Sequence, residues 1–166
     1  MGLATTIKAI FNSRDLGIPV YRGAAADVPN TVWTNLFTIT GGLVCLTSLI
    51  GVRTVAQTSV GASNMQFRHS VGNTVLDAVL DVQNDTVGTI YTLTGNPADA
   101  IQRGLGGITP LMGMAGGLLA TGINMRGRIM SAGNIQVAFT AADHAGSTRY
   151  VAFYIPLDPG AVVFPA

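Results

Sequence analysis

The sequence predicts an all-β chain that folds as an antiparallel β-sandwich of the jelly-roll type, preceded by an N-terminal arm. Apolar and polar residues alternate with a period of two in several short stretches, a pattern typical of half-buried strands. Turn signals rich in Gly, Asn and Asp separate these stretches roughly every ten residues. The chain contains no Glu and a single Lys, Lys8, so the residues that usually solvate helix faces are almost missing.

The strand pattern divides the chain into an arm and one domain. Residues 1–27 have weak periodicity and are expected to form an N-terminal arm with a linker, and residues 28–166 the sandwich. Within the sandwich, residues 104–125 are rich in Gly and Met and carry no charge, which predicts a loop packed against another subunit. The apolar C-terminus is expected to be a tail that docks on a neighbour. A short helix is expected after Pro97.

Residues 28–52 carry no charged side chain and are long enough to cross a membrane as a helix. Their period-two pattern argues against a membrane span: Phe37 and Ile39 share one face of "LFTIT", and Gly41 and Gly42 form a turn signal. The run "LVCLTSLI" then predicts a second, buried strand. We therefore expect two strands here and no membrane partner.

The same alternation continues along the chain. In "SNMQFRHSV" the apolar face includes His69, and in "NTVLDAVLDV" the side chains of Asp77 and Asp81 are expected on the polar face. Further strands are expected in "RTVAQTSV" and "TVGTIYTLT". Near the C-terminus, "GNIQVAFTA" and "TRYVAFYIPL" predict a hairpin closed by "DHAGS".

The charge content argues against nucleic-acid binding and points to assembly. Nine basic and eight acidic residues give a net charge of +1, so no field attracts phosphates. Charged residues make up 10% of the chain, against about 25% in typical soluble domains. A weakly charged surface favours self-association, and we expect a homo-oligomer. Cys45 is the only cysteine, which excludes an intrachain disulfide and a zinc knuckle.

No set of residues in the sequence predicts catalysis or a bound cofactor. His69 and His144 are the only imidazoles, and Asp143 next to His144 is expected in a hairpin loop. The stretch "DVQND" leaves two interpretations open. Asp81 and Asp85 bind a calcium ion with loop carbonyls, or Asp81, Asn84 and Asp85 form a turn through side-chain to backbone hydrogen bonds.

Interface candidates are large apolar residues in the arm, the Gly/Met-rich segment and the tail, together with the sole tryptophan, which belongs to the core or to an interface. They are Ile7, Ile10, Phe11, Trp33, Leu111, Met112, Met114, Leu118 and Phe164.

Three stretches carry a resemblance to a known group of proteins: "VPNTVWTNLFTITGGLVCLTSLIGVRTVAQTS", "NTVLDAVLDVQNDTVGTIYTLTGNPADAI" and "YVAFYIPLDPGAVV". In this order they resemble small virion structural proteins of tailed bacteriophages, of the capsid decoration (cement) or minor tail type. The resemblance spans about residues 28–163 and carries over no functional residue.

The resemblance implies a non-enzymatic protein on the capsid surface that binds the major capsid protein and other copies of itself, with a trimer as the expected form. Residues 1–27 and 104–125 are expected to make the capsid contacts. The alternative is a tail or fibre-associated module that binds host glycan. In that case Trp33, Tyr91, Tyr150 and Tyr154 would form the sugar platforms.

Overall fold

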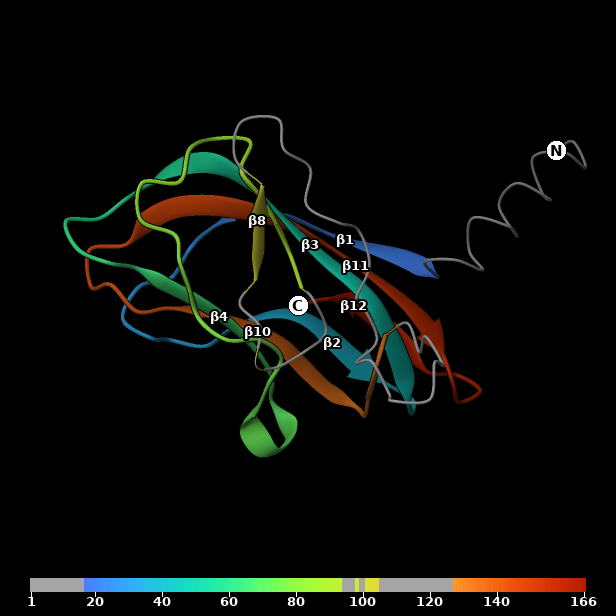
Figure 1. Cartoon of the computed structure of the whole chain (residues 1–166). Helices are drawn as coiled ribbons and strands as arrows, with labels where there is room; N and C mark the ends of the chain where they lie inside the picture. Colours follow the sequence, from blue (N-terminus) through green and yellow to red (C-terminus); the bar gives the residue numbers. More distant parts are fainter. Residues whose placement is uncertain (1–16, 94–97, 99–100, 105–126) are drawn as a thin grey trace, which may run out of the picture.

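The computed structural model describes residues 17–93, 98, 101–104 and 127–166, which form two antiparallel sheets packed face to face (Figure 1). Sheet A contains, in spatial order, β1 (Ile18–Ala26), β11 (Ala145–Pro156), β3 (Val44–Thr58), β7 (Ile90–Thr92) and β8 (Gln102–Gly104), and β9 (Arg128–Met130) also pairs with β3. Sheet B contains, in spatial order, β12 (Val162–Pro165), β2 (Thr34–Thr40), β10 (Gly133–Phe139), β4 (Asn64–His69) and β5 (Thr74–Val75), and β6 (Leu80–Asp81) also pairs with β4. The predicted all-β, antiparallel sandwich is confirmed.

The hydrophobic core lies between the two sheets. Leu46 and Leu49 of β3 face Phe37 and Ile135 of sheet B, and all four side chains are at most 1% exposed. The alternation predicted for "SNMQFRHSV" is also confirmed, since the side chains at alternate positions of β4 are buried. Burial of this apolar surface is the main free energy that holds the sheets together.

The uncharged run 28–52 folds as β2 and the first part of β3, as predicted, with Gly41 and Gly42 between the two strands at positive φ. A Cβ atom at Gly41 would collide with the backbone of Gly160, so the turn requires glycine there. Residues 44–58, predicted as two strands, form one continuous strand. Among the described residues, none forms a helix long and apolar enough to cross a membrane.

The predicted hairpin between residues 133–141 and 148–157 is wrong. Strand β10 pairs with β2 and β4 in sheet B, whereas β11 pairs with β1 and β3 in sheet A. The chain therefore crosses from one sheet to the other between them. Alternation shows that each strand has an apolar face, but it does not show whether the two strands pair edge to edge or pack face to face.

Residues 18–26 differ from the expected arm and linker, because they form β1 at the edge of sheet A. Pro19 is tolerated there, since an edge strand has backbone positions that pair with no neighbour. A register shift between Arg22 and Ala25 and a run of small residues obscure the period of two. Residues 1–16 and 105–126, which include most of the expected arm and the Gly/Met-rich loop, lie outside the described residues.

Two further expectations fail around short strands. The predicted strand over residues 73–82 is broken into β5 and β6, and Asp77 between them is buried rather than on a polar face. Its carboxylate accepts a hydrogen bond from the backbone N–H of Phe67, so it replaces a strand partner. Where a helix was expected after Pro97, residues 102–104 form β8.

Candidate functional site

A network of buried polar and charged side chains lies between the sheets, next to the apolar core. At its centre, the Asp27 carboxylate, just after β1, pairs with the Arg53 guanidinium of β3. The same Asp27 oxygen lies 3.0 Å from Nε2 of His144, in the connection between β10 and β11. The side chains of Asp27, Arg53 and His144 are at most 3% exposed. Burial of charges at this depth is tolerated only where partners compensate them.

Arg53 extends the network toward the edge of sheet A. Its Nε donates to the hydroxyl of Tyr91 at 3.3 Å, and this hydroxyl donates to Asp85 at 2.8 Å. Arg103 of β8 donates to the other Asp85 oxygen at 3.0 Å. Burial alone lowers the pKa of Arg53, but Asp27 and Tyr91 outweigh it and the pKa is raised. The guanidinium is therefore a permanent buried cation that depends on its partners.

His144 is fixed on both ring nitrogens. Its Nδ1 accepts from the Ser63 hydroxyl at 2.7 Å and from the Gln57 amide at 3.2 Å. The tautomer that satisfies all contacts carries its proton on Nε2 and donates it to Asp27. The ring also stacks on Phe139, with ring centroids 4.2 Å apart. His144 was expected in a hairpin loop; the structure places it in the connection between β10 and β11, where it is buried.

Ser63, His144 and Asp27 are the residue types of a hydrolase triad, but their arrangement does not suit catalysis. In such triads the serine bonds Nε2 and the carboxylate bonds Nδ1, which is the reverse of the order seen here. Ser63 is 0% exposed, so a substrate has no path to its hydroxyl. We conclude that the chain of hydrogen bonds joins β1, β3 and two connections of the sandwich.

This network was missed in the sequence because its members are far apart along the chain. Arg53 and Gln57 lie four residues apart in β3, a strand in which the polar Thr47 and Ser48 are also buried, so alternation alone did not single them out. Comparisons of the chain with protein-family models, with curated proteins and with solved structures found no match.

The tyrosines proposed as sugar platforms are buried. Tyr91, Tyr150 and Tyr154 are 1%, 3% and 4% exposed, which is incompatible with stacking on a glycan. Trp33 is half-buried and lies under the guanidinium of Arg68, whose central carbon is 4.1 Å from the ring centroid.

The remaining interface candidates are only partly described. Phe164 on β12 is 43% exposed. The other candidates lie outside the described residues: Ile7, Ile10, Phe11, Leu111, Met112, Met114 and Leu118.

The stretch "DVQND" forms the turn that was one of its two interpretations. Oδ1 of Asp81 accepts from the backbone N–H groups of Ser63 and Gln83 at 3.1 and 3.0 Å, an arrangement typical of a side-chain-closed turn. Asp85 instead bonds Tyr91 and Arg103. Among the described residues, no group of three or more His, Cys, Asp or Glu side chains comes together to hold a metal ion.

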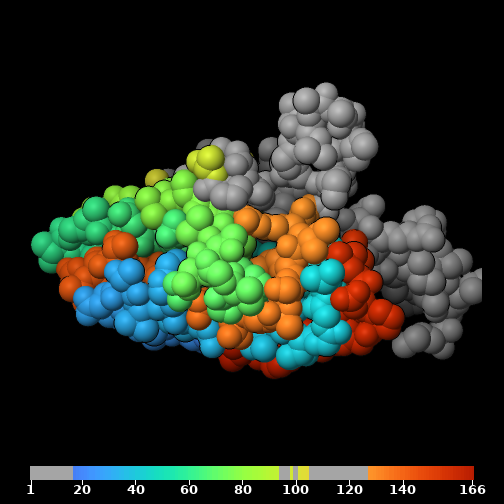
Figure 2. Space-filling view, turned by 90° about the horizontal axis from the view of Figure 1, so that it is seen from below, coloured from blue at the N-terminus to red at the C-terminus, as the bar shows by residue number. Residues whose placement is uncertain are grey.

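The outer faces of the two sheets differ sharply in polarity. On sheet B, Thr38 donates to Asn134 at 2.9 Å, Arg68 donates to Gln136 at 2.7 Å, and Gln136 donates to Asn35 at 2.7 Å. Figure 2 looks onto this side, where β2 (cyan), β10 (orange) and the 3-10 turn η1 (Val71–Asn73, green) lie close together. Such a ladder of polar side chains is typical of a sheet face in water.

The outer face of sheet A is mostly apolar instead, although the buried polar residues Ser48 and Thr92, register partners of Phe153 and Ile50, also lie on it. Register partners on this face bring together Tyr21, Cys45, Ile50, Val52, Ile90, Ile129, Val151, Phe153 and Ile155. Tyr21 and Ile129 are 70% and 57% exposed, and the others are half-buried. Arg149 of β11 adds one charge to this set. We call these residues the apolar face, and it is the surface most suited to contact another molecule.

We predict that Asp27→Asn destabilises the fold by about 3–5 kcal/mol, because it leaves Arg53 buried without its counter-charge. Urea unfolding of the two proteins measures the difference. Asp143→Asn is the control, since Asp143 is exposed and accepts only from the backbone N–H of Val60 among the described residues. If Asp27→Asn lowers the free energy of unfolding no more than Asp143→Asn does, the ion pair does not have this central role.

The raised pKa of Asp77 in the folded protein predicts that the free energy of unfolding falls as the pH rises. Burial raises its pKa to about 8, although the hydrogen bond from Phe67 opposes this. The folded protein therefore retains a proton that the unfolded chain releases above about pH 4. The stability that comes from protonated Asp77 is fully present below about pH 4. It is lost at about 1.4 kcal/mol per pH unit between about pH 4 and about pH 8.

We predict that Asp77→Asn flattens this slope and unfolds at higher urea than the native protein at about pH 8, with little difference near pH 4. Urea unfolding across this pH range provides the measurement. Asp143→Asn again serves as the control and should keep the native slope. Parallel slopes for the native protein and Asp77→Asn would show that Asp77 is ionised in the fold.

Proposed function

We propose that the chain is a non-enzymatic structural protein of a phage virion, a capsid decoration (cement) protein that stabilises the head by bridging neighbouring subunits. On this proposal it lies on the capsid surface and binds the major capsid protein and further copies of itself. The resemblance of residues 28–163 to small virion proteins supports this class.

The observation that carries the proposal is the apolar face of sheet A on a sandwich whose other outer face is polar. An antiparallel sheet that faces water usually alternates apolar and polar residues. Ile50 and Val52 of β3 and Phe153 of β11 break this pattern, because they point away from the core and are still apolar. Contact between copies of the chain through this face would remove its apolar surface from water.

The buried network supports a structural role over an enzymatic one. The residue types that could do chemistry, Ser63, His144 and Asp27, are used to hold the sandwich together and are enclosed. A glycan-binding tail module is weakened as well, because Tyr91 and Tyr150, two of its proposed platforms, are buried.

Residues 1–16 and 104–125 remain the proposed capsid contacts. The sequence placed the arm boundary at residue 27, but β1 begins at Ile18 and its removal would take the edge strand from sheet A. A deletion that separates attachment from folding should therefore end before residue 17.

We predict that antibodies against the chain label the heads of purified virions of the phage that carries its gene. Immunogold electron microscopy makes the measurement, with virions from a deletion strain as the control. Label on tails would favour the tail-associated alternative, and absence of label from virions would contradict a virion role altogether.

We predict that the chain forms a defined oligomer by light scattering and that Ile129→Asp lowers its mass, because a charge on the apolar face opposes the contact. Val71→Asp is a matched control, since Val71 is similarly exposed but lies in η1, next to sheet B. A native protein that is monomeric at every concentration, or equal loss of mass in both variants, would exclude the apolar face as the contact between copies.

A further inference from the structure

The outer face of sheet B carries an arginine that the fold holds in place without giving it a counter-charge. The guanidinium of Arg68 on β4 lies over the Trp33 ring, with its central carbon 4.1 Å from the ring centroid. Its Nε donates to Oε1 of Gln136 at 2.7 Å, and Gln136 in turn donates to Asn35 at 2.7 Å. Arg68 forms no salt bridge with any described carboxylate. The side chain is therefore fixed in position, while its two terminal nitrogens donate to no described residue.

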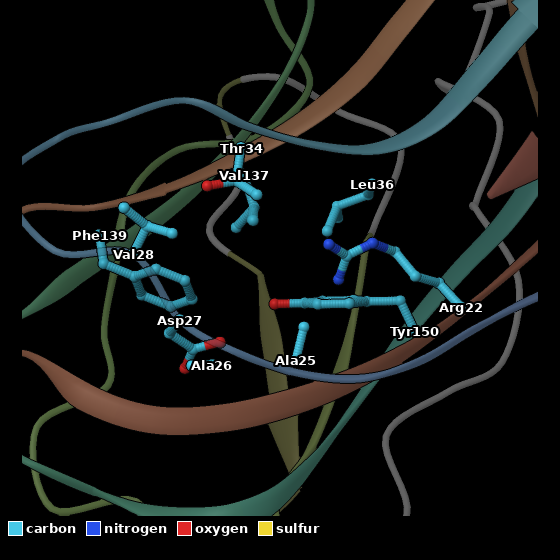
Figure 3. Close-up of a pocket in the computed structure, with 10 residues that line it drawn as sticks. All are labelled: Arg22, Ala25, Ala26, Asp27, Val28, Thr34, Leu36, Val137, Phe139 and Tyr150. Carbon is cyan, nitrogen blue, oxygen red and sulfur yellow. The ribbon is translucent and has the colours of Figure 1, made fainter. Parts of the chain in front are cut away.

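Most of the other described arginines differ from Arg68 in how they are held. Arg53 and Arg103 each pair with an aspartate. Figure 3 shows Arg22 on the wall of a small cavity between the sheets, and its Nε is buried. Arg149 is exposed on the outer face of sheet A and stacks on no described aromatic ring. Among the described arginines, Arg68 alone combines an aromatic support and a fixing hydrogen bond with the lack of a counter-charge.

A second arginine lies close to Arg68. Val75 of β5 is the register partner of Arg68, and its carbonyl accepts from Arg128 of β9 at 3.3 Å. Arg128 also forms no salt bridge with a described carboxylate. Asp77, two residues beyond Val75, does not neutralise this charge, because burial raises its pKa to about 8. We call the following residues the arginine patch: Trp33, Asn35, Arg68, Val75 and Arg128.

The arginine patch is suited to a carboxylate on a protein surface. The terminal nitrogens of a guanidinium match the two oxygens of a carboxylate and bind them together. Because Trp33 and Gln136 already order the Arg68 side chain, binding costs little further conformational entropy. Val75 adds apolar contact area, since it is 40% exposed. Tryptophan and arginine are also the residue types that most often dominate the binding energy of protein interfaces.

We propose that the arginine patch binds an acidic side chain on the surface of the major capsid protein, with Arg68 as the anchor that pairs with its carboxylate. This inference rests on the proposed function and adds a contact to those proposed for residues 1–16 and 104–125. It gives the two outer faces of the sandwich different partners. The apolar face of sheet A meets other copies of the chain, and the arginine patch on sheet B meets the capsid, so one copy can make both contacts at once.

The experiment mixes the purified chain with heads from a phage strain that lacks its gene and measures the bound fraction by co-sedimentation over a range of concentrations. Arg68→Gln should weaken binding about 30-fold, the loss typical of an interface hot spot. Arg68→Lys should also weaken it, because lysine keeps the charge but cannot bind a carboxylate through two nitrogens. Arg149→Gln, which removes an exposed charge from sheet A, should bind as the native chain does.

Thermal unfolding and light-scattering mass show whether each variant remains folded and assembled, and Arg68→Lys retains a cation over Trp33 if Arg68→Gln unfolds. Failure of the native chain to bind heads would overturn the proposed function together with this inference. Equal binding by the native chain and both Arg68 variants would overturn this inference alone. So would a lower oligomer mass for Arg68→Gln, which would place a second copy on the arginine patch. Binding of an acidic glycan that Arg68→Gln abolishes, with head binding unchanged, would assign the patch to a sugar instead.

Discussion

The buried ion pair between Asp27 and Arg53 is the interaction on which the rest of the structure depends. Arg53 sits in β3, a central strand of sheet A, and a guanidinium enclosed there is tolerable only if a carboxylate reaches it. Asp27 does so from the end of the edge strand β1, and it simultaneously accepts from His144 between the two sheets. One carboxylate therefore fixes an edge strand, a central strand and an inter-sheet connection. This combination limits how far β1 can shift along β11.

The sequence predicted the local elements well and their long-range partners poorly. Alternation is a property of neighbouring residues, so it identified β2 and β4 and the inward position of His69. Pairing depends on the whole chain, and the predicted hairpin of residues 133–157 failed because β10 and β11 belong to different sheets. Strand β1 was missed for another reason, since an edge strand with Pro19 and small residues carries little periodic signal.

Polar residues inside the sandwich could not be predicted from spacing alone. Asp77 occupies a position that alternation assigns to solvent, but the chain turns there and the carboxylate replaces a backbone partner of Phe67. His144 follows an exposed Asp143 and was expected with it in a hairpin loop, whereas Phe139 and Ser63 enclose it. In both cases the deciding contact comes from a distant or out-of-register residue, which a single sequence does not identify.

The apolar face of sheet A has a signal in the sequence that the sandwich fold makes interpretable. The runs "LVCLTSLI" and "YVAFYI" are nearly continuous in apolar residues, a pattern typical of strands covered on both faces. Packing on sheet B covers the inward residues of β3 and β11, Leu49 and Ala152 among them, and leaves Ile50 and Phe153 on the other side. Sheet B has a smaller surplus, Val162 and Phe164 on its edge strand β12, because Arg68 and Gln136 form the ladder at its centre. The surplus of apolar residues is thus larger on sheet A, because its two longest strands, β3 and β11, carry apolar residues on both faces.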